Sequence, residues 1–312
     1  MGVIEVEKKM TFKKPKWIRR IGAALLDFIC AILLMLILSF ATTPIVNKIF
    51  SGEELKKEYY SYAIATKLYE YDENNNIQVI YDVKTFDENL TYFYKNCTDN
   101  KIDEYINKKK ESPLFHYDET TNSYVENEYD YNDSSIRVQY TNFYVEIRDY
   151  CIKNYLDAYL NKNENYKVVA RKVSMLNYTS TLSAFVLSLI IIYLLIPLIN
   201  KDNKTIGKMF FKLLLISKVN IEIKPSKLQI LFRQLVLILF EFIFSISFIG
   251  LIGFPIPIGL IASILLAIFT KYHQSLHDIC SSTILIDDDY INKPIDEGDK
   301  YEITYYNLKE AK

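Results

Sequence analysis

The chain of 312 residues has little glycine, few cysteines and no strong imbalance of charge. A formal net charge of -1 gives no support to binding of a polyanion, so we do not expect nucleic acid as a partner. The four cysteines stand apart without a CxxC pair, which leaves the chain without the usual zinc and thiol-redox motifs. Cys97 and Cys151 fall in one long polar segment, where a disulfide and two free thiols both stay open.

The short motifs of common enzyme classes are also missing. The sequence has no GxSxG, no P-loop and no GxGxxG. His273 and His277 are spaced i, i+4, as in helical zinc sites, but no HExxH glutamate and no third ligand accompany them. We therefore expect no enzyme, no metal site and no cofactor. No internal repeat is visible in the sequence either.

Apolar residues are concentrated in blocks that are too long and too free of charge for the helices of a globular core. A membrane-spanning helix needs about 20 mostly apolar residues. The stretch between Arg233 and Lys271 is long enough for two such helices, and "GFPIPIG" separates them because proline and glycine end helices. The last span is short, so a re-entrant hairpin is an alternative there. We predict spans at 21–46, 174–199, 233–252 and 254–270.

Lysine and arginine gather before the first span, in residues 1–20, and between the second and third spans, in residues 200–232. Basic segments next to spans stay in the cytoplasm, and four spans place both of these on one side. The tail, 271–312, returns to that side. We expect an uncleaved multi-pass protein of the cell membrane with both termini in the cytoplasm, whose basic loop binds anionic headgroups.

Residues 47–172 then lie outside the cytoplasm, and they hold 19 of the 26 tyrosines. "SGEELKKEYYSYAIATKLYE" has the pattern of a helix, with Ser51 and Glu54 at capping-box spacing. "NIQVIYDVKTF" and "SIRVQYTNFYVEI" alternate as strands do. The predicted fold class is an all-α membrane protein, a four-helix transmembrane bundle with a small inserted α+β extracytoplasmic domain.

Two carboxylates fall inside the predicted spans. Arg20, Ala23 and Asp27 share one face of the first helix, with Asp27 about 10 Å deeper than Arg20 at ~1.5 Å per residue. Glu241 lies eight residues after Arg233, near the middle of the third span. An ionised carboxylate at that depth costs about 2.5 kcal/mol or more, so each must face protein or water and have a partner. For Asp27 the partner is Arg20 or an arginine of another segment.

Three segments together resemble the RDD family of bacterial membrane proteins, named for one arginine and two aspartates. The first is "RRIGAALLDFICAILLM", in which Arg20 opens the span and Asp27 lies within it. The second is "NKTIGKMFFKLLLI", similar to the family's TxGK segment, and the third is "QSLHDICSSTILI", similar to its LHD segment. The matching residues of these two segments are Thr205, Gly207, Lys208, Leu276, His277, Asp278 and Thr283.

The resemblance covers about residues 22–46 and 174–286. It implies a membrane protein with a role in transport, as expected of this family, whose transported ligands are unidentified. The chain departs from the family at Lys212 and Leu214 and at the pair Ser281–Ser282. The long insert between the first two spans is a further departure, since the family core lacks it.

The third segment places His277 and Asp278 at the cytoplasmic mouth of the bundle, just after the last span. Asp278 is expected to pair with Arg20 or Arg233 across that mouth, either as a latch that holds the helices together or as a gate. Truncating one partner of such a buried pair costs several kcal/mol, so a latch alone would explain why these residues are needed. The predicted charge network comprises Arg20, Asp27, Glu241, Arg233, His277 and Asp278.

Two functions follow from these features. In the first, the bundle transports ions or small solutes through its buried carboxylates, and because four spans are few for a conduction path, this requires a homo-oligomer. In the second, the protein is a non-catalytic scaffold or receptor whose extracytoplasmic domain binds a protein partner or an envelope ligand.

Overall fold

The computed structural model describes residues 3–128, 133–219, 224–243, 258–288 and 300–310. It is mostly helical, with small two-stranded sheets, as the predicted helical class requires. The chain divides into two compact units, which are described one at a time. Unit 1 comprises Met1–Thr43 and Ser180–Lys312, and unit 2 comprises Pro44–Thr179.

Among the residues that the structure describes, two helical runs are long and apolar enough to cross a membrane. The first is α1 (Trp17–Ile49), and the second runs from Glu164 to Ile199 through α7 (Glu164–Leu189), the π-helical segment η2 (Ile190–Leu195) and α8 (Ile196–Ile199). Most of their apolar surface is exposed, as at Ile37 and Phe40, which are 66% and 84% exposed. A helix of a globular core would instead bury that surface, so these runs suit a lipid environment.

The segments of the other two predicted spans are helical where the structure describes them. They contain α10 (Lys227–Val236), the π-helical segment η3 (Leu237–Ile243) and α13 (Ile258–Phe269). Residues 244–257 lie outside the described residues, and with them most of the "GFPIPIG" break, the end of the predicted span 233–252 and the question of a re-entrant hairpin.

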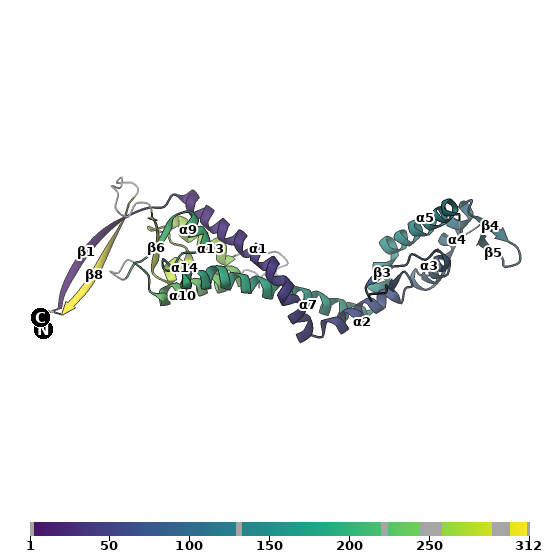
Figure 1. The fold of residues 1–312 in the computed structure, drawn as a ribbon, viewed down its shortest axis with the longest axis horizontal. Helices are drawn as coiled ribbons and strands as arrows, with labels where there is room; N and C mark the ends of the chain where they lie inside the picture. Colours follow the sequence, from purple (N-terminus) through teal and green to yellow (C-terminus); the bar gives the residue numbers. More distant parts are fainter. Residues whose placement is uncertain (1–2, 129–132, 220–223, 244–257, 289–299, 311–312) are drawn as a thin grey trace. The chain divides into compact units, whose positions relative to one another are not determined.

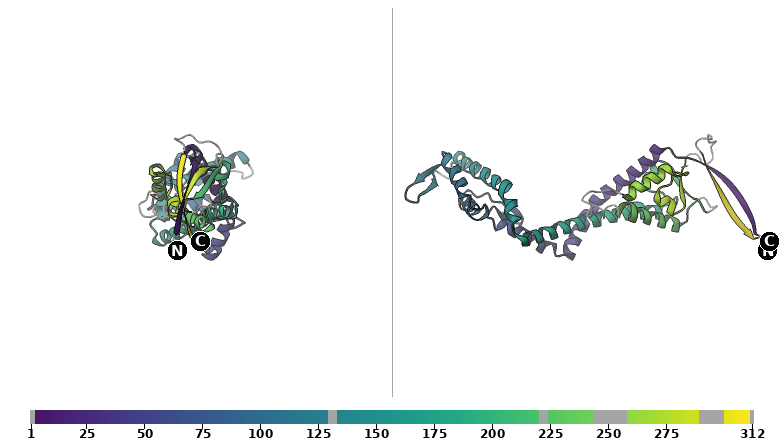
Figure 2. Two further views of the ribbon diagram at one scale, coloured as in Figure 1. Left: turned by 90° about the vertical axis from the view of Figure 1, so that its left-hand side faces the viewer. Right: turned by 180° about the vertical axis from the view of Figure 1, so that it is seen from behind.

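Unit 1 also contains strands, although the sequence predicted none outside the insert. Short helices α9 (Ile206–Phe210) and α14 (Leu276–Cys280) each lead into a fully buried strand, β6 (Leu213–Ser217) and β7 (Thr283–Asp287), and these two strands pair antiparallel. Strands β1 (Val3–Lys13) and β8 (Lys300–Glu310) pair along their whole length, which brings the two ends of the chain together (Figures 1 and 2).

A small apolar core joins these two sheets. Phe12 and Tyr301 pack with the β6–β7 sheet, whose Ile216 and Ile284 are completely buried. The apolar runs "LLLIS" and "TILID" therefore form strands because both of their faces are covered, and a five-residue run buried on both faces carries no periodicity that distinguishes strand from helix.

Unit 2 has the mixed helix and strand content that was expected of the insert. Two hairpins, β2–β3 and β4–β5, accompany its helices. In chain order its elements are α2 (Gly52–Ile64), β2 (Tyr69–Tyr71), β3 (Ile77–Val79), α3 (Val83–Cys97), α4 (Ile102–Glu111), β4 (Phe115–Asp118), β5 (Ser123–Glu126), α5 (Ser134–Cys151), η1 (Ile152–Leu156) and α6 (Asp157–Leu160).

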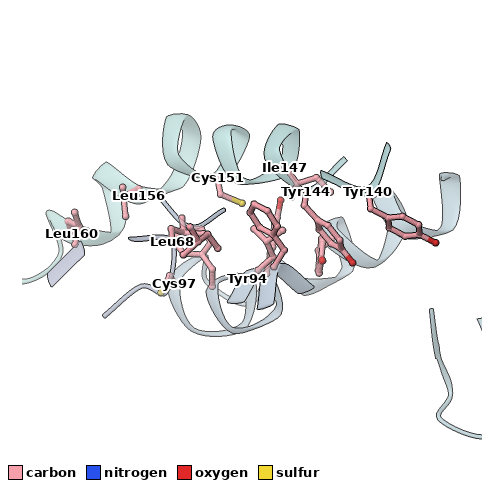
Figure 3. Packing of buried hydrophobic residues seen from close by; sticks show 14 of the residues in the cluster. Leu68, Tyr94, Cys97, Tyr140, Tyr144, Ile147, Cys151, Leu156 and Leu160 are labelled. Carbon is pink, nitrogen blue, oxygen red and sulfur yellow. The ribbon is translucent and has the colours of Figure 1, made fainter. Parts of the chain in front are cut away.

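The core of unit 2 is rich in tyrosine. Figure 3 shows side chains of α5 and the segments after it pointing toward Leu68 and Tyr94, with Cys97 and Cys151 among the labelled core residues. Tyr144 stacks on Phe86 with ring centroids 5.5 Å apart, and both are completely buried. Cys97 and Cys151 are free thiols here, so no disulfide contributes to this core.

Two local predictions for the insert are wrong. The segment "SIRVQYTNFYVEI" belongs to helix α5, whose buried residues Tyr140, Tyr144, Ile147 and Cys151 repeat with helical spacing. Its alternating β-branched and aromatic residues suggested a strand, but packing of one helical face against the core overrides that weak preference. Ser51 precedes α2 with a φ of 48° and forms no side-chain cap, so the predicted capping box is absent.

The aromatic core predicts a large effect of truncating Phe86. Phe86→Ala removes a fully buried ring and should lower the free energy of unfolding of unit 2 by about 3–5 kcal/mol. In the full chain without reductant, maleimide should then label the buried Cys151 on the order of 100-fold faster than in the wild type. Val138→Ala, at an exposed position of α5, should leave the rate unchanged; equal rates for all three proteins would contradict this core.

A buried polar centre as the candidate functional site

Asp27 lies on α1 with only 3% of its surface exposed, and its partners come from the start of α9. One carboxylate oxygen accepts a hydrogen bond from the Thr205 hydroxyl at 2.6 Å, and the other accepts one from the Gly207 backbone N–H at 2.7 Å. Backbone N–H groups in the first turn of a helix have no acceptor within the helix. The carboxylate supplies that acceptor and its charge suits the positive end of the helix dipole.

This contact depends on glycine at position 207. A Cβ atom added there would lie 2.0 Å from the carbonyl oxygen of Ala23, which belongs to the backbone of α1. Ala23 is itself buried, on the same face of α1 as Asp27. The absence of a side chain thus allows α9 to approach α1 closely enough for its backbone to reach Asp27.

Arg233 and Asp278 form a second buried contact. Arg233 donates from Nη2 and Nε to one oxygen of Asp278 at 2.7 and 2.9 Å, and each side chain is 3% exposed. Ser275, the N-cap of α14, donates its hydroxyl and its backbone N–H to the other oxygen. Burial by itself would raise the pKa of the Asp278 carboxyl, but the Arg233 guanidinium and His277 outweigh burial and hold that pKa well below its usual value.

Glu241 lies in η3 and is 5% exposed. Its Oε1 accepts a hydrogen bond from the Ser263 hydroxyl at 2.8 Å and lies 2.7 Å from Nδ1 of His277. The Ser263 oxygen in turn accepts the backbone N–H of Leu276, in the first turn of α14, at 3.1 Å. Glu241 thus contacts α14 directly through the side chain of His277 and indirectly through Ser263. Single π-helical segments within α-helices are frequent at functional sites.

A cavity of about 510 Å³ joins these groups. Its wall includes Lys208, which is 8% exposed and forms no hydrogen bond or ion pair with any other residue that the structure describes. Burial, followed by the charge of Arg233, lowers the pKa of the Lys208 ammonium to about 7. Lys208 is therefore a group of the cavity wall whose charge changes near neutral pH.

All of the residues of the predicted charge network line this one cavity, namely Arg20, Asp27, Arg233, Glu241, His277 and Asp278. Of the two partners predicted for Asp278, the structure shows Arg233. Arg20 donates to the backbone carbonyl of His273 rather than to Asp27, and the hydrogen-bond partners of Asp27 are uncharged. Only the TxGK resemblance marked Thr205 and Gly207 in advance, and nothing in the sequence marked Ser263 or Ser275.

The side chains of His273 and His277 contact different partners. His273 Nδ1 lies 3.1 Å from the carbonyl oxygen of Ala267, whereas His277 contacts Glu241 and Ser275. Within the described ranges, no group of three or more His, Cys, Asp or Glu side chains is arranged to hold a metal ion.

Residues 158–282 match the sequence model of the RDD family. The resemblance inferred from the three motifs is thereby confirmed over the range that holds Thr205, Arg233, Glu241 and Asp278, while Asp27 on α1 lies outside the matched range. Searches of curated proteins and of solved structures found no match to the chain.

The contact between Asp27 and α9 predicts energetic coupling between Asp27 and Thr205. Asp27→Asn and Thr205→Val should each destabilise the protein, and the double variant should lose about 1–2 kcal/mol less than the sum, because both changes break the same charged hydrogen bond. Unfolding of the full chain in mixed detergent micelles measures the three values. Asp27→Asn combined with Thr85→Val, in unit 2, is the control and should be additive; additivity in both pairs would refute the contact.

Proposed function

Because the chain carries an RDD family domain, we propose that it is a multi-pass membrane protein that transports ions or small solutes through a bundle with buried carboxylates. The four predicted spans are part of this proposal. The exposed apolar side chains of α1, η3 and α13, such as Phe40, Phe240 and Phe269, support it, because they would face lipid. The basic segments 1–20 and 200–232 would lie at the cytoplasmic headgroups, with 47–172 outside the cell.

The observation that carries the proposal is the joint presence of acidic and basic groups around one cavity. Isolated charges at lipid depth are costly and, where they occur, usually face a wet interior path. Here Asp27, Glu241 and His277 all reach the same 510 Å³ space. A closed structural latch needs the Arg233–Asp278 pair, but it needs no cavity with further ionisable groups.

Glu241 and His277 are the pair best suited to carry a proton. A carboxylate and an imidazole nitrogen 2.7 Å apart share one hydrogen bond. A proton can move between such groups while the two side chains stay in place. The oxygens of Asp27, in contrast, accept bonds from an immobile backbone N–H and from a hydroxyl that does not titrate. We assign Asp27 a positioning role and Glu241 the role of proton or cation carrier.

The test is flux through proteoliposomes that contain the purified full chain. With an imposed pH gradient, wild-type vesicles should acidify faster than empty vesicles, and Glu241→Gln should lower the rate at least tenfold, because glutamine does not titrate. Glu119→Gln, at an exposed position of unit 2, is the matched control and should keep the wild-type rate. Equal rates for wild type and Glu241→Gln, or for wild type and empty vesicles, would contradict a proton-conducting role.

The second candidate function is a scaffold or receptor, and the separate core of unit 2 favours it. Sixteen buried residues, most of them aromatic or aliphatic, form a cluster that lies wholly within this unit. A segment that only linked two spans would not need such a core. In this alternative the bundle is an anchor, and unit 2 binds a protein or an envelope ligand.

Transfer of unit 2 to another anchor separates the two functions. Residues 44–179, placed between two spans of an unrelated membrane protein, should fail to restore the phenotype of a strain that lacks the chain, because the transport site stays behind in unit 1. Full restoration by this chimera would favour the scaffold. Surface expression of the chimera, checked by protease accessibility, is the control.

A further inference from the structure

Unit 1 contains a structural repeat that the sequence did not reveal. Asn203 and Lys212 have left-handed backbones, with φ of 55° and 51°, and the residues 70 positions later, His273 and Ser282, have φ of 50° and 52°. The N-caps of the short helices, Thr205 and Ser275, have the same spacing, as do α9 and α14 and the strands that follow them. Segments 203–218 and 273–288 are therefore two copies of one structure.

A local two-fold axis relates these copies. Leu215 pairs in the sheet with Leu285, which is its own counterpart. The carbonyl oxygen of Lys212 accepts the N–H of Asp288 at 3.0 Å, and that of Ser282 accepts the N–H of Lys218 at 2.9 Å. Each hydrogen bond is the image of the other.

Helices α1 and α10, which lie further back in the chain, contact the two copies in corresponding ways. Arg19, at the start of α1, donates from Nε to the carbonyl oxygen of Phe211 at 3.0 Å. Gln229, at the start of α10, donates to that of Ser281, the counterpart of Phe211, at 3.3 Å. The cavity has wall residues from both copies, through α9 and α14, and from the helices that contact them, α1, α10 and η3.

The comparison of the two copies distinguishes Lys208 from its counterpart Asp278 among the residues that the structure describes. Lys208 and Asp278 occupy the same position, the third residue of α9 and of α14. The Asp278 carboxylate accepts hydrogen bonds from Arg233, from Ser275 and from the hydroxyl of Thr283. Lys208 as a whole is 8% exposed, and its ammonium has three donors and no acceptor among the described residues.

We propose that Lys208 is the binding site for a small monovalent anion and that the cavity takes up a proton together with this anion. A buried ammonium that lacks an acceptor gains most from a ligand that supplies one with negative charge. The proposal rests on the transport function above and specifies its cargo as a proton and an anion that enter together.

The charges around Lys208 explain why the anion would be monovalent and accompanied by a proton. Three basic side chains, Arg20, Lys208 and Arg233, and three acidic ones, Asp27, Glu241 and Asp278, line the cavity along with His277. A neutral Lys208 that accepts one proton and one monovalent anion leaves the total charge of this set unchanged. A divalent anion would add an uncompensated negative charge beside the three carboxylates.

The same groups determine the direction of the pH dependence. Burial and Arg233 lower the pKa of Lys208 to about 7, and Arg20 acts in the same sense, whereas Asp27 and Asp278 oppose the shift. The anion binds the protonated form of Lys208, so its apparent affinity should be nearly constant below about pH 7. Above it the affinity should fall about tenfold per pH unit, because each bound anion then requires the uptake of one proton.

The test is calorimetric titration of the purified full chain in detergent with sodium acetate or sodium chloride as the probe, between pH 6 and 8.5. Runs in two buffers with different ionisation enthalpies count the protons taken up per anion. The wild type should bind at least one probe and take up close to one proton per anion at pH 8.5. Acetate alone would indicate a carboxylate cargo, and chloride alone a halide.

Three variants make the result decisive. Lys208→Arg keeps the charge but does not titrate, so it should bind the probe with constant affinity and without proton uptake. Lys208→Met should lose the binding, and Lys201→Met, at an exposed position of the same loop, should behave as the wild type. The proposal is overturned if the wild type binds neither probe, or if Lys208→Arg still takes up a proton. Because binding is measured without a membrane gradient, failure of transport leaves this test intact.

Discussion

A carboxylate placed among apolar helices must find hydrogen-bond donors, and Asp27 finds them at the start of α9. The Thr205 hydroxyl and the Gly207 N–H together satisfy both of its oxygens. The same contact satisfies a helix terminus that would otherwise leave a backbone N–H without an acceptor. Because α9 leads directly into β6, this one interaction positions the short helix and the buried strand that follows it against α1.

In the second copy of the repeat, different side chains supply the hydrogen bonds to a buried carboxylate. Where the first copy has Gly207, the second has His277, whose side chain together with Ser263 connects Glu241 to α14. The Arg233–Asp278 pair satisfies the carboxylate of Asp278 together with Ser275, whereas Lys208 at the corresponding position of α9 faces the cavity. In the proposed function, the Arg233–Asp278 pair would hold the helices together and Lys208 would bind cargo.

The sequence predicted that Asp27 and Glu241 are sheltered by other helices and that Asp278 pairs with Arg20 or Arg233, because charges inside an apolar block demand partners; the structure buries both carboxylates and shows Arg233. It did not predict that Asp27 binds uncharged donors, since a hydroxyl and a glycine amide carry no signal of that kind. The repeat is not visible in the sequence because its copies share a backbone and few side chains: Thr205 and Ser275 both stand at an N-cap, but Lys208 and Asp278 have opposite charges. In unit 2, α5 was missed because aromatic residues that face a core also favour strands.

Hydrogen exchange of the Gly207 amide tests the central contact most directly. Gly207 is the second residue of α9, where an N–H has no acceptor within the helix, so any protection must come from elsewhere. In the full chain labelled for NMR, this amide should exchange slowly in the wild type and at least 100-fold faster in Asp27→Ala. Rapid exchange in the wild type, or equal protection in both proteins, would contradict the contact between Asp27 and α9.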